Sequence, residues 1–322
     1  MEYRNFLGFK ISILGLGTWA FGSDRWWGPQ EDKDSFTVLD EALKKGVNLI
    51  DTAPVYGRGH SEEIIGEFLE KRRLREKVIL ATKLGLSWEG GRIYHNLKKE
   101  RMLEEIDESR KRLKTDYIDI YQVHWPDKNT PIGETATTMY EFYKKKIIKA
   151  IGVSNYSVEE MREFMKYSPL HFLQPPYNMF RREIENDIIP FCRKNNIGII
   201  SYISLHSGIL TGKFFFENVK VPSDLCRKNH TDLKEPRFSI NKETLLKIKK
   251  IAEKYNKTLT QFVLNWTYHQ KGITSILVGA RNKKQIEEIL ESVGWKIEKE
   301  NYEKVKEILS SREQLLNLYK TG

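Results

Sequence analysis

The chain has 322 residues, of which 39% are hydrophobic, so it is long enough for one large α/β barrel or for two smaller domains. Its formal net charge is +10, but the basic residues are scattered through segments with a helical pattern, which favours a solvated surface and indicates no nucleic-acid partner. Its two cysteines, Cys192 and Cys226, are far apart, so neither a disulfide framework nor a cysteine zinc site is indicated, and a reducing cytoplasm fits best.

The first residues predict a small hairpin. Residues 2–11 have Gly8 at their centre and are expected to form a hairpin that caps the bottom of a barrel. The apolar stretch 11–22 lacks a basic segment followed by a long apolar run. We therefore expect neither a signal peptide nor a membrane span.

Along the rest of the chain, short apolar runs with strand character alternate with longer amphipathic runs with helix character. This alternation is typical of repeated βα units around a parallel sheet. The expected strands are 14–17, 47–50, 78–82, 117–123, 148–153, 172–174, 198–202 and 273–278. We therefore expect a (β/α)8 TIM barrel of the α/β class, with residues 1–322 forming a single domain.

Two later segments stand apart from the repeat. Residues 213–238 form the longest stretch without clear periodicity, and long ordered loops in compact domains are usually functional. Residues 298–310 predict one extra C-terminal helix after the eighth unit.

Polar residues stand at the ends of three consecutive strands, where the active sites of such barrels lie. Asp51, Lys83 and His124 directly follow the second, third and fourth strands, and Tyr56 lies five residues beyond Asp51. Each has an ordinary structural explanation when taken alone, as a turn residue, a solvated charge, a core histidine or a packed aromatic. Because these strands are neighbours, we expect the four side chains to meet at one end of the barrel.

Together these side chains could transfer a proton. The unperturbed pKa of a phenol is near ~10, and reversible proton transfer near neutral pH works better if that pKa is lowered. Lys83 beside the phenol oxygen is expected to lower the pKa of Tyr56, while Asp51 keeps Lys83 charged. His124 would orient a substrate carbonyl. The histidines show no His-x-x-x-His or similar spacing, so no metal is expected.

The sequences around these residues resemble the aldo-keto reductase family. They are Asn48-Leu49-Ile50-Asp51-Thr52-Ala53-Pro54-Val55-Tyr56-Gly57, Ala81-Thr82-Lys83, Val123-His124-Trp125-Pro126 and Gly152-Val153-Ser154-Asn155. The resemblance implies that Asp51, Tyr56, Lys83 and His124 form a catalytic tetrad. It also implies reduction of aldehydes and ketones to alcohols by hydride transfer from NADPH, with Tyr56 as the general acid.

The bacterial general-stress branch of that family is suggested by two further features. They are the segment Gln174-Pro175-Pro176-Tyr177-Asn178, and Arg227 with Pro236-Arg237-Phe238 in the long loop.

The same resemblance implies an NADP(H) site along the strand ends and the loops after the seventh and eighth strands, where helix N-termini can bind phosphates. The residues implied are Gly17, Thr18, Trp19, Asp51, Ser154, Asn155, Gln174, Tyr202, Ser204, Leu205, Gly208, Leu210, Gly212, Lys213, Arg227, Gly279, Arg281, Gln285 and Glu288.

Individual roles at the nicotinamide end follow from the resemblance. Ser154, Asn155 and Gln174 would bind the carboxamide, although Ser154 and Gln174 could equally satisfy local backbone groups. Tyr202 would stack on the nicotinamide ring.

At the other end of the cofactor, Arg281 and Gln285 would approach the adenosine 2′-phosphate, and Glu288 would approach the adenine. A fixed cation at that place favours NADP over NAD. Arg227 could clasp the cofactor or simply be exposed.

A competing motif is Gly15-Leu16-Gly17-Thr18-Trp19-Ala20, which matches the G-x-G-x-x-G/A fingerprint of dinucleotide-binding domains. That fingerprint must open a helix. Gly22, Gly28 and Pro29 follow instead, so no helix is expected to start before about residue 31.

Aromatic side chains are expected to wall the substrate pocket, although core packing explains any one tryptophan equally well. They are Trp19, Tyr56, Trp88, His124 and Trp125, with Trp26 or Trp27 as further candidates. Such walls suit small aldehydes, dicarbonyls and aryl carbonyls. The expected partner is a small carbonyl substrate, and the expected assembly is a monomer or weak homo-oligomer.

Two other functions stay open. One is a cofactor-sensing barrel like the potassium-channel β subunits that resemble this family, against which the complete tetrad argues. The other is a structural or sugar-isomerising barrel, which would bind no nicotinamide.

Overall fold

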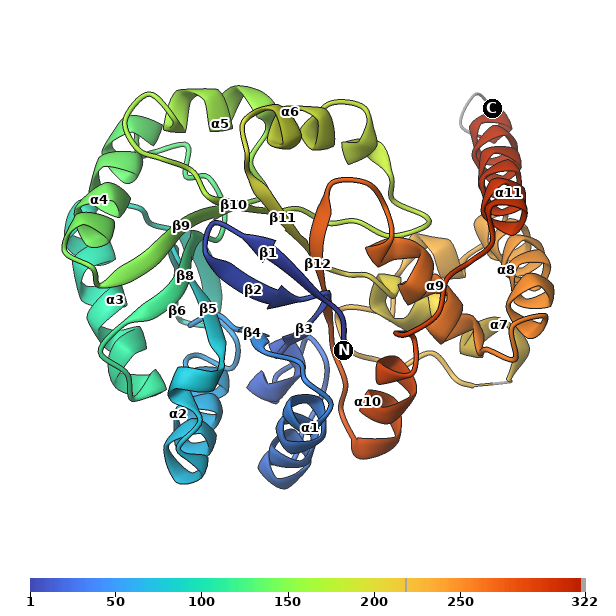
Figure 1. The fold of residues 1–322 in the computed structure, drawn as a ribbon, viewed down its shortest axis with the longest axis horizontal. Helices are drawn as coiled ribbons and strands as arrows, with labels where there is room; N and C mark the ends of the chain where they lie inside the picture. The colour runs from blue at the N-terminus through green and yellow to red at the C-terminus, as the bar shows by residue number, and fades with distance from the viewer. Residues whose placement is uncertain (218, 320–322) are drawn as a thin grey trace.

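The computed structural model describes residues 1–217 and 219–319, and within them eight parallel strands close into a barrel (Figure 1). The strands are β3 (Leu14–Gly17), β4 (Leu49–Asp51), β5 (Ile79–Leu84), β8 (Ile118–Val123), β9 (Ile148–Ser154), β10 (Phe172–Gln174), β11 (Gly198–Ser201) and β12 (Ile273–Val278). Every bound lies within two residues of the range expected from the sequence, and the (β/α)8 barrel is confirmed.

Helices cover the outside of the barrel in chain order. They are α1 (Asp32–Lys44), α2 (His60–Arg72), α3 (Lys99–Leu113), α4 (Ile132–Lys144), α5 (Val158–Phe164), α6 (Ile188–Lys194), α9 (Leu259–Tyr268) and α10 (Lys283–Leu290). Two of them begin with reciprocal capping boxes, formed by Ser157 with Glu160 and by Thr258 with Gln261. Such caps satisfy backbone N–H groups that have no partner inside the helix. The first α-helix starts at Asp32, as the glycines before it predict.

The N-terminal hairpin closes one end of the barrel (Figure 1). It consists of β1 (Tyr3–Phe6) and β2 (Phe9–Ser12), joined by two residues with positive φ, as a tight hairpin turn requires. Phe6 and Phe9 pack on Phe172 inside the barrel, with ring centroids 5.4 and 6.0 Å apart. Because this end is plugged by apolar side chains, ligands can enter only from the carboxyl ends of the strands.

Three parts of the chain differ from expectation or extend it. A second hairpin, β6 (Leu86–Glu89) with β7 (Arg92–His95), follows β5 and was not predicted, although its Gly90-Gly91 turn is a hairpin signature. The stretch expected as a long loop contains α7 (Lys213–Phe216) and the start of α8 (Arg237–Glu253). The extra C-terminal helix is confirmed as α11 (Lys299–Leu318), which is longer than predicted and packs against α8 (Figure 1).

No helix in the described part of the chain is both long and apolar enough to cross a membrane.

Glu105 of α3 is a carboxylate buried behind the barrel wall. Its Oε2 accepts a hydrogen bond from the Gly85 N–H at 2.9 Å, while its Oε1 has no partner among the described residues. Burial raises the pKa of Glu105 from 4.5 to about 7. A carboxyl group with a raised folded-state pKa contributes stability that is fully present below the unfolded pKa and is lost as the pH rises through about 7.

We therefore expect Glu105→Gln to be more stable than the wild type at pH 8, by roughly 3 kcal/mol in the free energy of unfolding. The difference should vanish below about pH 4.5, where both side chains are neutral. Urea unfolding at several pH values measures it. Glu104→Gln, at an exposed neighbouring carboxylate, is the matched control. Equal stability of Glu105→Gln and wild type at pH 8 would show that the buried charge costs nothing.

Candidate active site

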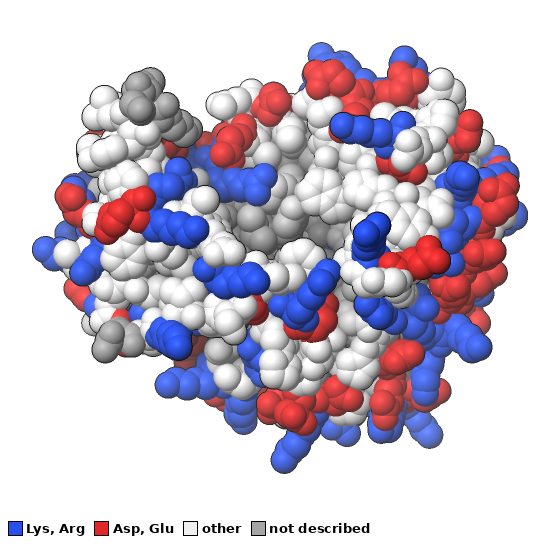
Figure 2. Space-filling view, turned by 180° about the vertical axis from the view of Figure 1, so that it is seen from behind, with Lys and Arg blue, Asp and Glu red and all other residues white. Residues whose placement is uncertain are grey.

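A cavity of about 1420 Å³ opens at the carboxyl ends of the strands. Figure 2 shows this face, with a central hollow and Lys and Arg side chains around its rim. The wall includes residues from the ends of β3, β4, β9, β10, β11 and β12 and from the loops that follow them. This is the end of the barrel that the hairpin leaves open.

A buried ion pair lies beneath the cavity floor. Lys83 Nζ, on β5, donates to Asp51 Oδ1 at 2.6 Å and to the Thr52 carbonyl oxygen at 2.9 Å. Its third partner is the Tyr56 hydroxyl at 3.5 Å. The two charged side chains are only 1% and 3% exposed. With all three donors of the ammonium engaged, Lys83 is fixed beneath the phenol.

Two glutamines complete the partners of Asp51. Its Oδ2 accepts from Gln174 Nε2 at 2.8 Å and from Gln122 Nε2 at 3.2 Å. Gln122 was not predicted from the sequence, because it lies within the buried run of β8 and not at its end. Neutral amides satisfy the second carboxylate oxygen without adding charge, as a buried ion pair requires.

Tyr56 lies above Lys83 on the loop after β4. Its ring stacks on Trp19 at 5.8 Å and meets His124 edge-on at 5.9 Å. Two glycines hold this loop in place. A Cβ on Gly22 would lie 2.5 Å from the Gly57 nitrogen, and one on Gly57 would lie 2.3 Å from the Gly22 oxygen. Only glycine permits so close an approach of the two loops.

The pKa of Tyr56 differs from the sequence-based expectation. Burial, followed by the negative charges of Asp51 and Asp24, raises the pKa of Tyr56 well above its ordinary value. The expected lowering by Lys83 was wrong, chiefly because the phenol is buried, and also because Asp51 lies closer to the ammonium than the phenol does and compensates its charge. Tyr56 is therefore held in its protonated form, which is the form a general acid needs.

His124 directly follows β8 and is held by both neighbouring strand ends. Its N–H donates to the Leu84 carbonyl at 3.0 Å, and its carbonyl accepts from Asn155 Nδ2 at 3.1 Å. Burial, the charge of Lys83 and that of His95 lower the pKa of His124 well below its ordinary value. The imidazole is therefore neutral and can donate one hydrogen bond and accept another.

The ends of β9, β10 and β11 form a connected polar wall. The Ser154 hydroxyl donates to the Gln174 carbonyl at 2.8 Å, and the Tyr202 hydroxyl donates to Asn155 Oδ1 at 2.8 Å. Ser154 thus satisfies a local backbone group, which is one of the two roles that the sequence left open for it. All four residues line the cavity.

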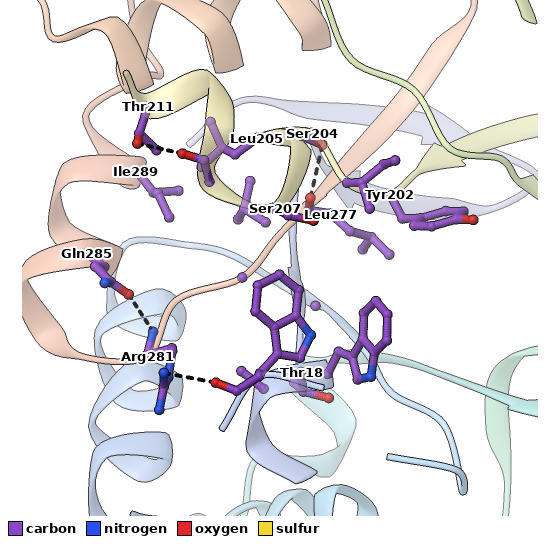
Figure 3. A pocket seen from close by; sticks show the side chains of 18 of the residues that line it. Thr18, Tyr202, Ser204, Leu205, Ser207, Thr211, Leu277, Arg281, Gln285 and Ile289 are labelled. Atoms are coloured by element: carbon purple, nitrogen blue, oxygen red, sulfur yellow. Dashed lines mark hydrogen bonds between the residues drawn. The ribbon is translucent and has the colours of Figure 1, made fainter. Parts of the chain in front are cut away.

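After β11 the backbone is strained where it borders the cavity. Ile203, His206 and Ser207 have φ of 54°, 50° and 56°, which is costly for a β-branched residue such as Ile203. The Ser204 hydroxyl ties the segment to the Leu277 carbonyl at 3.0 Å (Figure 3). Backbone strain of this kind is commonly stored at functional sites.

Nine of the eleven residues expected at the phosphate and adenine end of the cofactor line the cavity. Those present are Ser204, Leu205, Gly208, Lys213, Arg227, Gly279, Arg281, Gln285 and Glu288. Leu210 and Gly212 are not in the wall. Leu210 is fully buried in the core, and Gly212 packs against Phe216 and Leu259.

The loop before α10 carries Arg281, whose N–H donates to Gln285 Oε1 at 2.8 Å (Figure 3). Its guanidinium binds the carbonyls of Trp27 and Pro29 and the side chain of Gln30. Arg281 therefore joins this loop to the first loop of the barrel, a link between residues about 250 positions apart.

Glu288 Oε1 accepts from the Thr258 hydroxyl at 2.8 Å. One oxygen of the residue expected at the adenine is therefore engaged by the start of α9.

Arg227, in the long segment before α8, lies in the cavity wall and is only 7% exposed, so the exposed alternative is wrong. It pairs with Asp224 and lies 5.3 Å over the Trp27 ring. The backbone beside it donates from Leu225 and Cys226 to the carbonyls of residues 25 and 26. The first loop and the long segment are thus joined across the cavity.

Aromatic rings surround the other end of the cavity. Trp19, Tyr56, His124 and Trp125 line it as expected, together with Trp26 and Trp27. Trp88 does not line it, although its cross-strand partner in the unpredicted hairpin, Ile93, does. Leu86 and His95 of the same hairpin complete this wall.

Within the described residues, one group of side chains lies close enough together to hold a cation: His206, His230 and Asp232. Asp232 already accepts from His206 at 2.6 Å, Arg237 at 2.7 Å and Arg312 at 3.5 Å. The two guanidinium groups supply the positive charge that a cation would bring. The cluster joins His206 to His230 and Asp232, more than 20 residues further along the chain, so residue spacing gave no indication of it.

Comparison with known proteins gives a family match. The model of the Aldo/keto reductase family matches residues 13–310. The aldo-keto reductase YhdN of Bacillus subtilis is 41% identical over 314 residues, which cover 97% of this chain and 94% of that protein. The match with a bacterial reductase agrees with the branch expected from the sequence.

A second relative and one solved structure are also similar to this chain. The NADH-specific methylglyoxal reductase of Escherichia coli is 36% identical over 299 residues, covering 86% of this chain and 88% of that protein. The structure of the glycerol dehydrogenase AKR11B4 from Gluconobacter oxydans superposes with a TM-score of 0.89 at 36% identity, covering 97% of this chain and 96% of that one.

Proposed function

The chain belongs to the aldo/keto reductase family of oxidoreductases, and we propose that it uses NADP(H) to reduce small aldehydes, dicarbonyls or aryl aldehydes to alcohols, with Tyr56 as the general acid. One observation carries this proposal. A buried lysine ammonium lies within hydrogen-bond reach of a protonated phenol at the floor of a large cavity. We also propose that residues 1–322 act as one domain.

The cavity suits a phosphorylated nicotinamide cofactor. Its volume of about 1420 Å³ exceeds the roughly 300–1,000 Å³ of common ligand pockets, leaving room for a dinucleotide and a small substrate. Lys213, Arg227 and Arg281 place cationic groups in the wall. The indole N–H of Trp27, also in the wall, is buried without a partner in the described chain. These groups would hold the phosphates and polar edges of the cofactor.

When bound, NADPH supplies the hydride that reduces the carbonyl carbon. Tyr56 donates its proton to the carbonyl oxygen, and the Lys83 ammonium stabilises the phenolate that remains. Asp51 fixes the position of Lys83. The neutral His124 donates a hydrogen bond to the same carbonyl oxygen and orients it above Tyr56.

Preference for NADP over NAD is assigned to Arg281 at the start of α10. The E. coli relative is named an NADH-specific enzyme, so family membership alone does not decide between the two cofactors. A guanidinium bound to a phosphate forms charge-assisted hydrogen bonds worth roughly 1.5–3 kcal/mol.

We therefore expect Arg281→Leu to weaken NADPH binding about 10- to 100-fold and to leave NADH binding nearly unchanged. Quenching of protein fluorescence on titration measures both dissociation constants. Lys283→Leu, two residues after Arg281 at the first position of α10 and paired with Glu41, is the matched control. Equal weakening of both cofactors would mean that Arg281 only supports the first loop.

The proposed function is tested by following NADPH absorbance with a panel of aldehydes. Consumption that depends on the aldehyde supports it. Tight NADPH binding without turnover would favour a cofactor-sensing barrel, and no nicotinamide binding would favour a structural or isomerising one.

A further inference from the structure

His95 offers a hydrogen-bond acceptor at the mouth of the cavity. Its Nδ1 lies 2.8 Å from the Pro126 carbonyl oxygen. A carbonyl oxygen can only accept, so Nδ1 must carry the proton. In the neutral imidazole the other nitrogen, Nε2, then carries a lone pair and no hydrogen.

This imidazole belongs to the same part of the chain's fold as His124. It lines the same cavity as Tyr56 and His124. Its anchor, Pro126, is two residues beyond His124, so the second hairpin is fastened directly to the segment that carries His124. His95 is also among the groups that lower the pKa of His124, after burial and Lys83, so the two imidazoles lie within electrostatic range of one another.

The surroundings of His95 provide little else that could accept a hydrogen bond. The wall at this end consists of the apolar or aromatic side chains of Trp19, Trp26, Val55, Leu86, Ile93 and Trp125. Arg25 also lines it, but a guanidinium can only donate, and it donates to the Gly91 carbonyl at 3.4 Å. Asn155 also lines the cavity, but its Oδ1 already accepts a hydrogen bond from Tyr202. Among the described side chains at this end, apart from Tyr56 and His124, the imidazole of His95 is thus the one with an unoccupied acceptor for a substrate hydroxyl.

We propose that His95 is a specificity-determining residue whose Nε2 accepts a hydrogen bond from a hydroxyl group adjacent to the substrate carbonyl. The preferred substrates are then α-hydroxy aldehydes and α-hydroxy ketones, and vicinal diols in the reverse direction. This inference rests on the proposed function and narrows its substrate class. Because His95 is exposed at the mouth and competes with water, its effect on selectivity is modest, roughly 5- to 10-fold.

The test uses substrate pairs that differ only by hydroxyl against methyl. They are glycolaldehyde with propionaldehyde, and hydroxyacetone with butanone. The measured quantity is the ratio of kcat/KM within each pair, normalised to the wild type, which cancels the intrinsic reactivity of the carbonyls.

Three substitutions separate the two nitrogens of His95. His95→Asn keeps a donor for the Pro126 carbonyl but is too short to place an acceptor at the position of Nε2, His95→Phe removes both groups, and His95→Gln can place an amide oxygen near the position of Nε2. We expect the normalised ratio to fall 5- to 10-fold in the first two and to stay within about 2-fold in His95→Gln. Tyr94→Phe, next to His95 but outside the cavity wall, is the control.

An unchanged ratio in His95→Asn and His95→Phe would overturn the inference while leaving carbonyl reduction intact. Equal losses for both members of a pair would also overturn it, because His95 would then only support the hairpin. A wild-type protein that reduces neither member of either pair but does reduce other aldehydes of the panel would overturn the inference alone. A wild-type protein that reduces no aldehyde at all would refute the proposed function itself, and the inference with it.

Discussion

Replacing Tyr56 by phenylalanine is expected to lower kcat for aldehyde reduction by about 10²- to 10⁴-fold while NADPH binding stays within about 3-fold of the wild type. Phenylalanine keeps the stacking on Trp19 and the edge contact with His124. It removes only the hydroxyl that burial keeps protonated and that lies 3.5 Å from Lys83. Single-turnover kinetics and fluorescence titration measure the two quantities separately.

The matched control for this substitution is Tyr167→Phe, which removes a hydroxyl from an exposed tyrosine. Its kcat should equal that of the wild type. Normal aldehyde reduction by Tyr56→Phe would refute the assignment of Tyr56 as the proton donor. A loss of NADPH binding in step with the loss of kcat would instead place the hydroxyl among the cofactor contacts.

Replacing Lys83 by methionine is expected both to abolish reduction and to lower the free energy of unfolding by about 3–5 kcal/mol. The reason is that Asp51, 3% exposed, would lose its one cationic partner among the described residues, Lys83, and keep only the two neutral glutamines. Urea unfolding measures the stability. Lys71→Met, which breaks a surface pair with Glu67, should change the stability by less than about 1 kcal/mol.

The double variant Asp51→Asn with Lys83→Met separates the two roles of this pair. Because it leaves no unpaired charge, it should recover most of the stability lost in Lys83→Met. It should remain inactive, because no ammonium faces the phenol. A double variant less stable than Lys83→Met would show that the destabilisation does not come from the unpaired, buried carboxylate of Asp51.

Much of the fold and the four proposed catalytic positions could be predicted from the sequence for one reason. Each strand is a short apolar run, and Asp51, Lys83 and His124 stand where three neighbouring runs end. The polar residue at a strand end is visible in the sequence, and the barrel brings strand ends together.

Other features depend on geometry that the sequence does not display. Gln122 lies inside a buried strand. The register of β8 against β5 places it directly opposite Lys83, where its amide can also donate to Asp51. His95 reaches the cavity on a hairpin whose two strands are too short to stand out among the larger units.

The pKa of Tyr56 was predicted in the wrong direction for a related reason. The sequence shows that Lys83 and Tyr56 can be neighbours. It does not show how deeply the phenol is buried, or that Asp51 lies nearer to the ammonium. The raised pKa keeps Tyr56 protonated, so that it can donate a proton during reduction. The Lys83 ammonium then stabilises the phenolate that forms during the reaction.

In the proposed reaction, hydride passes from C4 of the nicotinamide to a carbonyl carbon while Tyr56 supplies the proton. The most direct measurement uses NADPH deuterated separately at each of its two C4 positions, with an aldehyde in ordinary water and mass spectrometry of the alcohol. We predict that one of the two cofactors delivers a single deuterium to the carbinol carbon and the other delivers none. An alcohol without deuterium from either cofactor, or no alcohol at all, would contradict the account.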